Sequence, residues 1–345
     1  MKKLDLHGIK QANAKAIFLS AASRDKISRA DIASGTGLSL MTVGKVVDVL
    51  LEAGIVSQHK EDRVSAGRRA GLLTLRAERY SVVIDLSERA FRINIVDLAL
   101  KLSDSMTYKY NPKYMYDENL RLFLKNAGAF IKRRPDLDNL YGIGISIPGI
   151  YISSDDRVVS TKVPELETIP IRAEAEKLLG QPVSLVMKNV EAAALSAMTR
   201  LPDFRDRVIV YMFMGESVDG AVCDHGRFIR GAHEFGCDFG RMVLRYGELL
   251  ETRIRTSSTD EMMANELSSA VYNIITILDP DAFIIESDLP REPDFLINNI
   301  KSALRCMYKL PEERIPTFIT NGVGLRHSAR GVAMTLRDKW LDSIL

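Results

Sequence analysis

Cysteine and long apolar runs are both scarce in this chain of 345 residues. The three cysteines are widely spaced and odd in number, which argues against a disulfide framework and fits a reducing cytoplasm. No run of about 18 uncharged apolar residues is present, so we expect no membrane span. The lysines at positions 2 and 3 are not followed by an apolar segment, and we therefore expect no signal peptide.

An excess of charge of one sign is also missing, because the 47 Lys and Arg residues are nearly balanced by 45 Asp and Glu residues. The distribution is nevertheless uneven. Residues 1–79 hold 14 basic and 8 acidic residues, and the remainder holds 33 and 37. A basic N-terminal module on a mildly acidic body suits a polyanionic partner at one end, although small domains carry such charge by chance about as often. The chain length indicates two or three domains.

The first 54 residues carry the pattern of three helices. We predict helices over residues 9–22, 29–34 and 40–53, with Ser28 and Ser39 as N-caps and Gly54 as the stop of the third. A turn over residues 35–37 separates the second helix from the third. In the third helix Val43, Val46, Val47 and Leu50 share one face, and Met41, Thr42 and Lys45 point away from it.

Two predicted strands, residues 55–58 and 72–75, follow these helices, with a polar turn at 59–63 and a basic loop at 65–69. Three helices and a hairpin are the order of a winged helix-turn-helix, so we assign residues 1–79 to a DNA-binding domain. The third helix would read the major groove, and the loop would contact phosphates or the minor groove. The residues expected to contact DNA are Ser39, Met41, Thr42, Lys45, Arg68 and Arg69. The alternative is a three-helix interaction module with a solvated loop.

From Tyr80 onward, strands alternate with helices, which predicts an α/β body with mixed sheets. The predicted strands cover residues 81–84, 91–96, 141–147, 183–187, 208–214, 220–223 and 282–286. The predicted helices cover residues 118–132, 171–179, 190–198 and 260–278, and a last helix starts at 325.

Several stretches of the chain resemble the ROK family of repressors, open reading frames and kinases. In the N-terminal part they are residues 27–33, 37–39, 42–43 and 50–56, and the loop reads Ser-x-Gly-Arg at 65–68, as in the repressor branch. In the body they are residues 142–149, 190–195 and 226–242. The resemblance implies that residues 80–345 form a two-lobed actin-like ATPase domain that senses a ligand and dimerises. Lobe one would cover about 80–188 plus the C-terminal helix, and lobe two about 189–324.

The elements that the resemblance associates with catalysis are altered. A family kinase cradles the ATP phosphates with Asp-x-Gly-Gly-Thr, whereas this chain has Asp85-Leu86-Ser87-Glu88-Arg89. Glu286-Ser287 stands in place of a Gly-Gly turn beside the nucleotide. Lys188-Asn189 aligns with the Asn-Asp pair that supplies the general base, and an amide accepts no proton near neutral pH. We therefore expect no phosphoryl transfer and no enzyme activity.

The structural zinc of the family is expected to be missing as well. Arg241 replaces its histidine, and residues 245–251 contain no cysteine where the family has a cysteine cluster. Zinc needs about four N or S ligands, so we expect no metal and no cofactor. His225 and His233 lie between Cys223 and Cys237, which leaves a metal site open there, although buried core cysteines are the favoured interpretation.

The resemblance also indicates where a ligand would bind, because Asp238 stands at the position of the family's sugar-binding Glu. The residues expected to bind the ligand are Pro148, Gly149, Lys188, Asn189, His233, Asp238 and Arg241. Lys188 and Arg241 add positive charge, which favours an anionic sugar derivative. Pairing of these cations with Asp238 or Glu191 in a closed cleft is the equally supported alternative.

Together these features predict a cytoplasmic DNA-binding regulator, and more specifically a repressor, of carbohydrate metabolism genes. A sugar or sugar derivative in a catalytically inactive kinase-like domain would control it. One winged helix covers only a half-site on the operator, so we expect at least a homodimer. Two alternatives remain open, namely an active carbohydrate kinase that also binds DNA and a regulator controlled by a protein partner.

Overall fold

The computed structural model describes residues 6–60, 71–76, 78–86, 90–201, 203–215, 217–289, 293–320 and 327–344. The chain divides into two compact units. The first comprises Met1–Ile145, Ile169–Val186 and Val332–Leu345, and the second comprises Ser146–Thr168 and Met187–Gly331. Residues 146–168, which we expected in lobe one, thus belong to the second unit. The boundary at residue 79 stays a prediction.

The N-terminal module contains helices α1 (Leu6–Ala22), α2 (Arg29–Thr36) and α3 (Leu40–Glu52), and a sheet with the order β1-β3-β2. Its strands are β1 (Ile27–Ser28), β2 (Val56–Lys60) and β3 (Gly71–Leu75). The three predicted helices and the predicted hairpin strands are confirmed. The two residues of β1 are too few to leave an alternating pattern, and the sequence did not reveal them.

Two boundaries in this module differ from expectation. Gly35 and Thr36 close α2 instead of forming a turn, and His59 and Lys60 extend β2 by pairing with β3. The N-caps are as predicted: the Ser28 hydroxyl accepts a hydrogen bond from the Asp31 N–H at 3.1 Å, and the Ser39 hydroxyl accepts one from the Thr42 N–H at 3.2 Å. These bonds satisfy amide groups that a helix start leaves without partners.

The N-terminal module shares its apolar core with the last helix of the chain, α10 (Ser328–Ile344). Phe18 of α1, Leu50 of α3 and Leu341 of α10 are all fully buried in this cluster. The Arg337 guanidinium lies over the Phe18 ring at 5.1 Å from its centre. Lys15 in α1 forms an ion pair of 2.9 Å with Asp342. The module is therefore packed onto α10 by apolar and charged contacts.

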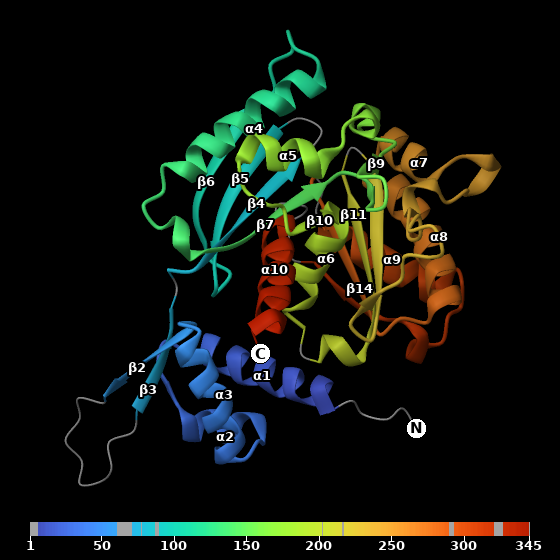
Figure 1. Ribbon diagram of the computed structural model, residues 1–345. Helices are drawn as coiled ribbons and strands as arrows, with labels where there is room; N and C mark the ends of the chain where they lie inside the picture. The colour runs from blue at the N-terminus through green and yellow to red at the C-terminus, as the bar shows by residue number, and fades with distance from the viewer. Residues whose placement is uncertain are drawn as a thin grey trace. The chain divides into compact units, whose positions relative to one another are not determined.

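The rest of the first unit is built on a five-stranded sheet with the order β10-β7-β4-β5-β6. The strands are β4 (Tyr80–Leu86), β5 (Ala90–Asp97), β6 (Leu102–Lys109), β7 (Leu140–Ile147) and β10 (Leu185–Lys188). Helices α4 (Tyr116–Lys132) and α5 (Ile171–Leu179) lie on one face of the sheet and α10 on the other, as Figure 1 shows. Strand β6 was not predicted because it is an edge strand whose residues are exposed or half-buried, which gives no clear alternation.

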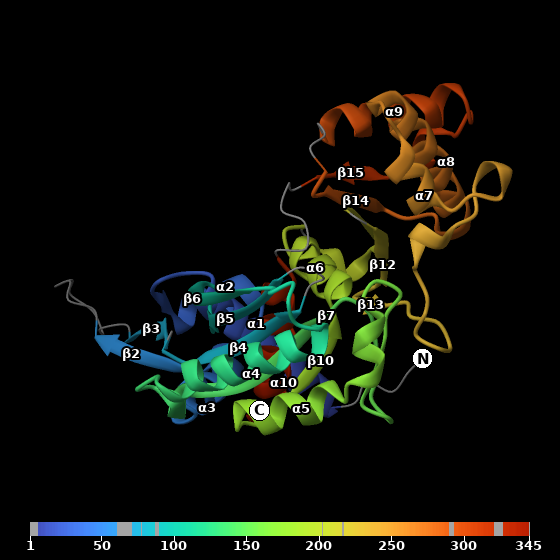
Figure 2. The same ribbon diagram turned by 90° about the horizontal axis from the view of Figure 1, so that it is seen from above.

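The second unit is built on a five-stranded sheet with the order β13-β12-β11-β14-β15, which lies between two helical layers. Its strands are β11 (Val208–Met214), β12 (Val218–Asp224), β13 (Arg227–Phe228), β14 (Ala282–Ser287) and β15 (Thr317–Ile319). In β11, Ile209 and Tyr211 pack in the cluster of helix α6 (Asn189–Met198), and Val210 and Met212 pack in the cluster of α8 (Asp260–Leu278). Figure 2 shows α6 on one side of the sheet and α8 on the other.

Shorter elements complete the second unit. They are the hairpin β8 (Ile150–Ile152) and β9 (Arg157–Val159) and helices α7 (Leu250–Thr256) and α9 (Pro293–Cys306). Six 3₁₀ segments complete the described elements: Leu137–Asn139, Pro164–Thr168, Phe204–Asp206, Phe239–Arg241, Arg245–Gly247 and Glu312–Arg314. Among the described helices, none is by itself long and apolar enough to cross a membrane. Only the bent pair α2 and α3 passes that test, and only jointly.

A close approach between α10 and α6 yields a stability prediction. A methyl group on Gly331 would overlap the backbone carbonyl of Ala192, whereas one on Gly35 in α2 would meet no atom within 4 Å. We expect Gly331→Ala to lower the free energy of unfolding by about 1–3 kcal/mol through overpacking. Gly35→Ala, the matched control, should raise it by about 0.5–1 kcal/mol. Urea unfolding measures both, and an unchanged stability of Gly331→Ala would refute the close packing.

Candidate functional site

The exposed side of α3 carries the described residues that were predicted to contact DNA. Ser39, Met41 and Lys45 are exposed, with Met41 at 71% exposure, and Thr42 is half-buried. The hydroxyls of Ser39 and Thr42 lie 2.9 Å apart, so both take part in the helix cap. Met41 and Lys45 are therefore the side chains of this set that the cap leaves unengaged. Arg68 and Arg69 lie outside the described residues.

Two neighbours of this surface were missed by sequence analysis. Leu40 is 62% exposed at the start of α3. Arg29 in α2 forms an ion pair of 2.8 Å with Asp48 in α3. This ion pair joins α2 to α3. A search of the sequence for single basic residues does not detect such a pair, because its two members lie in different helices.

A buried carboxylate that links two lysines is the main feature of the second unit. Asp219 in β12 is only 6% exposed. Its Oδ1 lies 2.8 Å from the Nζ of Lys188, and its Oδ2 lies 3.0 Å from the Nζ of Lys162. Lys188 ends β10 directly before α6, and Lys162 follows β9. The Gly220 N–H also donates to Oδ1 at 2.8 Å, so three donors hold this carboxylate.

The pKa values of the two aspartates beside these lysines are shifted in opposite directions. Burial alone would raise the pKa of Asp219, but the ammonium groups of Lys188 and Lys162 outweigh it and hold that pKa below its usual value. Burial raises the pKa of Asp238, and the negative charge of Asp219 adds to this effect. Asp219 is thus held ionised, whereas ionisation of Asp238 is disfavoured.

These charged groups line a hollow with a volume of about 50 Å³. That volume admits roughly three or four water molecules, so a sugar needs its walls to move apart. Four of the predicted ligand residues line the hollow: Pro148, Gly149, Lys188 and Asp238. The other lining residues are Ile150, Val159, Ser160, Thr161, Lys162, Asp219 and Phe235.

The remaining predicted ligand residues lie elsewhere. His233 and Arg241 are exposed and do not belong to the lining. Asn189 is the first residue of α6, 6% exposed, and its Oδ1 is a buried atom without a hydrogen-bond partner in the described part of the chain. In the alternative of a closed cleft, Lys188 would pair with Asp238 or Glu191. The structure instead pairs Lys188 with Asp219, and Glu191 with Arg230 at 2.7 Å.

The segments that replace the kinase phosphate turns are only partly described. Asp85 is buried and lies 3.8 Å from Arg92, and residues 87–89 lie outside the described part of the chain. Glu286 and Ser287, which stand in place of the family's Gly-Gly turn, both belong to strand β14, and the predicted strand over 282–286 is confirmed. The Tyr211 hydroxyl donates a hydrogen bond of 3.1 Å to the buried Glu286 carboxylate. Burial and this carboxylate both raise the pKa of Tyr211.

The cysteines and histidines do not assemble into a metal centre in the described ranges. No group of three His, Cys, Asp or Glu side chains lies close enough there to hold a metal ion. All three cysteines are free, and Cys223 is buried in the apolar cluster of α6. Cys237 lies 3.3 Å from the carbonyl of Ile229. The expected lack of zinc stays a prediction.

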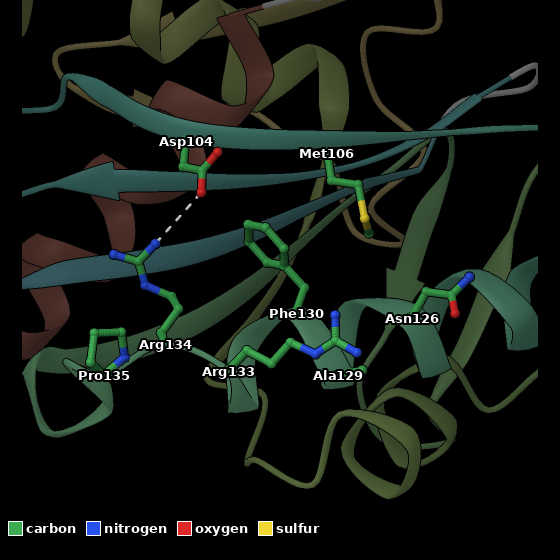
Figure 3. A pocket seen from close by; sticks show the side chains of 8 residues that line it. All are labelled: Asp104, Met106, Asn126, Ala129, Phe130, Arg133, Arg134 and Pro135. Atoms are coloured by element: carbon green, nitrogen blue, oxygen red, sulfur yellow. Dashed lines mark ion pairs between the residues drawn. The ribbon is translucent and has the colours of Figure 1, made fainter.

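A larger hollow, of about 520 Å³, lies in the first unit between β6 and α4 (Figure 3). Met106 and Phe130 form its apolar part. Arg134 lies at its edge, 3.7 Å from Asp104. Arg134 also binds Asp136 at 3.0 Å, so its charge is neutralised locally. None of the predicted site residues lies in this hollow.

Part of the chain matches a known protein family. Residues 81–252 match the ROK family. A xylose repressor from Caldicellulosiruptor bescii is 23% identical over 243 residues, which cover 69% of this chain and 60% of the repressor. The match thus spans about three fifths of that relative.

The solved structures extend the comparison to the fold. A ROK family transcriptional regulator, a homologue of the E. coli MLC protein, has a TM-score of 0.74 at 17% identity and covers 98% of both chains. The ROK hexokinase from Thermus thermophilus has a TM-score of 0.59 at 17% identity and covers 74% of this chain and 97% of its own. The body therefore has the actin-like fold of ROK repressors and sugar kinases, as the resemblance implied.

The opposite pKa shifts of Asp219 and Asp238 yield a prediction for the dependence of stability on pH. The pKa of Asp219 is lowered from 3.8, so its contribution to stability is present above that pH and is lost as the pH falls through the lowered pKa. Asp238 has a raised pKa, so its ionisation costs stability as the pH rises past 3.8. At pH 7 we expect Asp219→Asn to lower the free energy of unfolding by about 3–5 kcal/mol, because two half-buried ammonium groups lose their buried counter-charge. Asp238→Asn should raise it.

Urea unfolding between pH 3 and pH 7 measures both effects. The two differences from the wild-type protein should shrink toward the acid end, where the carboxyls of both states become protonated. A destabilised Asp238→Asn variant at pH 7, or an Asp219→Asn variant as stable as the wild-type protein, would contradict the assigned electrostatics.

Proposed function

Because this chain belongs to the ROK family, we propose that it is a DNA-binding transcriptional regulator, and specifically a repressor, of carbohydrate metabolism genes. One observation carries the proposal. The likeness to a ROK transcriptional regulator extends over 98% of this chain, and thus over the N-terminal module, whereas the likeness to the ROK hexokinase covers 74%. The N-terminal module, packed onto α10, is the part that a kinase fold alone does not account for.

The DNA contacts are assigned to α3 and to the loop after β2. Met41 and Lys45 project from an exposed helix surface whose opposite side, with Val43, Val47 and Leu50, is fully buried. A helix anchored in this way can enter the major groove without exposing the core of the module. Arg68 and Arg69 are proposed to add phosphate or minor-groove contacts, which chiefly supply affinity.

The controlling ligand is assigned to the hollow in the second unit. Asp238 lines it, and its half-buried carboxylate forms no hydrogen bond or ion pair within the described ranges, so it is available to a sugar hydroxyl. Asn189, the residue after Lys188, does not line the hollow, but its buried Oδ1 has no hydrogen-bond partner in the described part of the chain, and we propose it as a second acceptor for a ligand that reaches it. The relative named as a xylose repressor supports a sugar or sugar derivative as the ligand class.

Catalysis is excluded from the proposal. Asn189 carries an amide where the resemblance places a general base, and an amide does not take a proton near neutral pH. The kinases among the structural neighbours support the alternative of an active kinase only at the level of the family. A regulator controlled by a protein partner remains the other alternative.

Assembly and location complete the proposal. We place the protein in the cytoplasm, where its DNA partner would be and where free thiols such as its three cysteines persist. We expect at least a homodimer, since a single α3 helix covers only half of an operator.

DNA binding is tested by fluorescence anisotropy with DNA from the protein's own promoter region. The combined variant Lys45→Ala, Arg68→Ala and Arg69→Ala should lose about tenfold or more in affinity, and the dependence of log affinity on log salt should become shallower. The matched control is Arg305→Ala, which removes an exposed cation of the second unit that pairs with Glu312. Equal affinities of the combined variant and the control would refute the assigned surface.

Phosphoryl transfer is tested by a coupled ADP-release assay over a panel of hexoses, pentoses and amino sugars. We expect no sugar-dependent turnover, because a general base contributes about 10²–10⁴ to the rate and is missing here. Asn189→Asp alone should not restore turnover, since the phosphate turns are altered as well. Sugar-dependent ADP release by the wild-type protein, with an active hexokinase as the assay standard, would establish the kinase alternative instead.

A further inference from the structure

We propose that the hollow around Asp219 selects an uncharged sugar and rejects phosphorylated or acidic sugar derivatives. The inference rests on the proposed ligand-controlled function and adds the charge class of the ligand. It reverses the expectation that Lys188 and Arg241 would attract an anion.

The first argument is that both ammonium groups of the hollow already have a buried counter-ion. Lys188 lies 2.8 Å from one oxygen of Asp219, and Lys162 lies 3.0 Å from the other. The Gly220 N–H holds the same carboxylate in place. An incoming phosphate or carboxylate would have to compete with a fixed internal anion for both cations.

The second argument is the charge balance of the lining. The hollow is lined by two residues with ammonium groups, Lys162 and Lys188, and by two with carboxyl groups, Asp219 and Asp238. Arg241 is exposed and outside the lining, although its charge acts on the Asp238 carboxyl, and Arg230 is bound by Glu191. Both ammonium groups of the described lining are thus bound to an internal anion, and an incoming anion would have to be desolvated next to the ionised Asp219, which repels it.

The third argument is that the same groups suit hydroxyls. Each ammonium group has three donors, and the contact with Asp219 uses one of them, so both lysines can still donate to a sugar oxygen. Asp238 can accept from a hydroxyl. Phe235, half-exposed in the lining, offers an apolar surface to a sugar ring. Donors, an acceptor and an apolar surface together match a neutral polyol.

The test begins with isothermal titration of the full-length protein. D-Xylose, D-glucose and N-acetylglucosamine are compared with D-glucose 6-phosphate, D-gluconate and inorganic phosphate. We expect at least one uncharged sugar to bind, and each anion to bind about tenfold more weakly or not at all. A sugar phosphate that binds more tightly than its parent sugar would overturn the proposal, as would a panel in which no uncharged sugar binds.

A variant then reverses the selectivity. Asp219→Asn removes the internal anion and leaves both ammonium groups without a counter-charge, so inorganic phosphate should bind it about tenfold or more tightly than it binds the wild-type protein. Phosphate should also raise the melting temperature of this variant and leave that of the wild-type protein unchanged. The matched control is Glu312→Gln, which removes the carboxylate of an exposed ion pair of the same unit. A folded Asp219→Asn protein without any gain for phosphate would overturn the proposal.

The wild-type titrations decide the question even if Asp219→Asn does not fold. Operator binding is measured on the same preparations to separate the two proposals. Loss of operator binding with intact sugar selectivity would refute the regulator and leave the charge selectivity standing. Intact operator binding together with a preference for anions would refute the charge selectivity and leave the regulator standing.

Discussion

The burial of helix α10 is the constraint on which the proposed regulation depends. Its first residues belong to the second unit, where Gly331 lies against the backbone of Ala192 in α6. Its last turns supply Leu341 to the apolar core of the N-terminal module. A single helix of 17 residues, about 25 Å long, therefore runs from the second unit into the core of the module that carries α3.

The contacts along this helix suggest how a ligand could act on DNA binding. Lys188 lines the hollow and directly precedes α6, and α6 touches α10 at Gly331. A sugar that contacts Lys188 would therefore act directly before the first residue of α6. Coupling between two sites requires an element whose two states are biased by both of them. Helix α10 is the described element that has Gly331 beside α6 at its start and Leu341 in the core of the N-terminal module near its end.

Much of the fold was predictable because local patterns determine it. The bounds of α5, β11 and α8 agree with the predicted ones, since each has a clear apolar period and a turn or cap at its ends. Two strands were not predicted from the sequence, because β1 is too short and β6 is too exposed to show alternation. The site was harder. Pro148, Gly149, Lys188 and Asp238 line one hollow together, and their role in ligand binding stays a prediction, whereas Asp219 in the same lining was not named from the sequence.

The reason for this omission is physical. Asp219 is one acidic residue within an apolar strand, and its partners lie 31 and 57 positions away in the chain. No local spacing reveals a pairing that only the folded sheet creates. His233 and Arg241 were assigned to the hollow from resemblance alone, and in the structure both are exposed. The charge of a site therefore depends on long-range pairs more than on the residues that a motif contains.

The central claim is that a sugar bound in the second unit changes the affinity of the N-terminal module for DNA. The most direct measurement is the operator dissociation constant with and without a saturating uncharged sugar, together with the sugar dissociation constant with and without operator. For a repressor that the sugar releases, we predict that sugar weakens operator binding about fivefold or more, and that operator weakens sugar binding by the same factor. Operator affinity that is identical with and without bound sugar would contradict the claim.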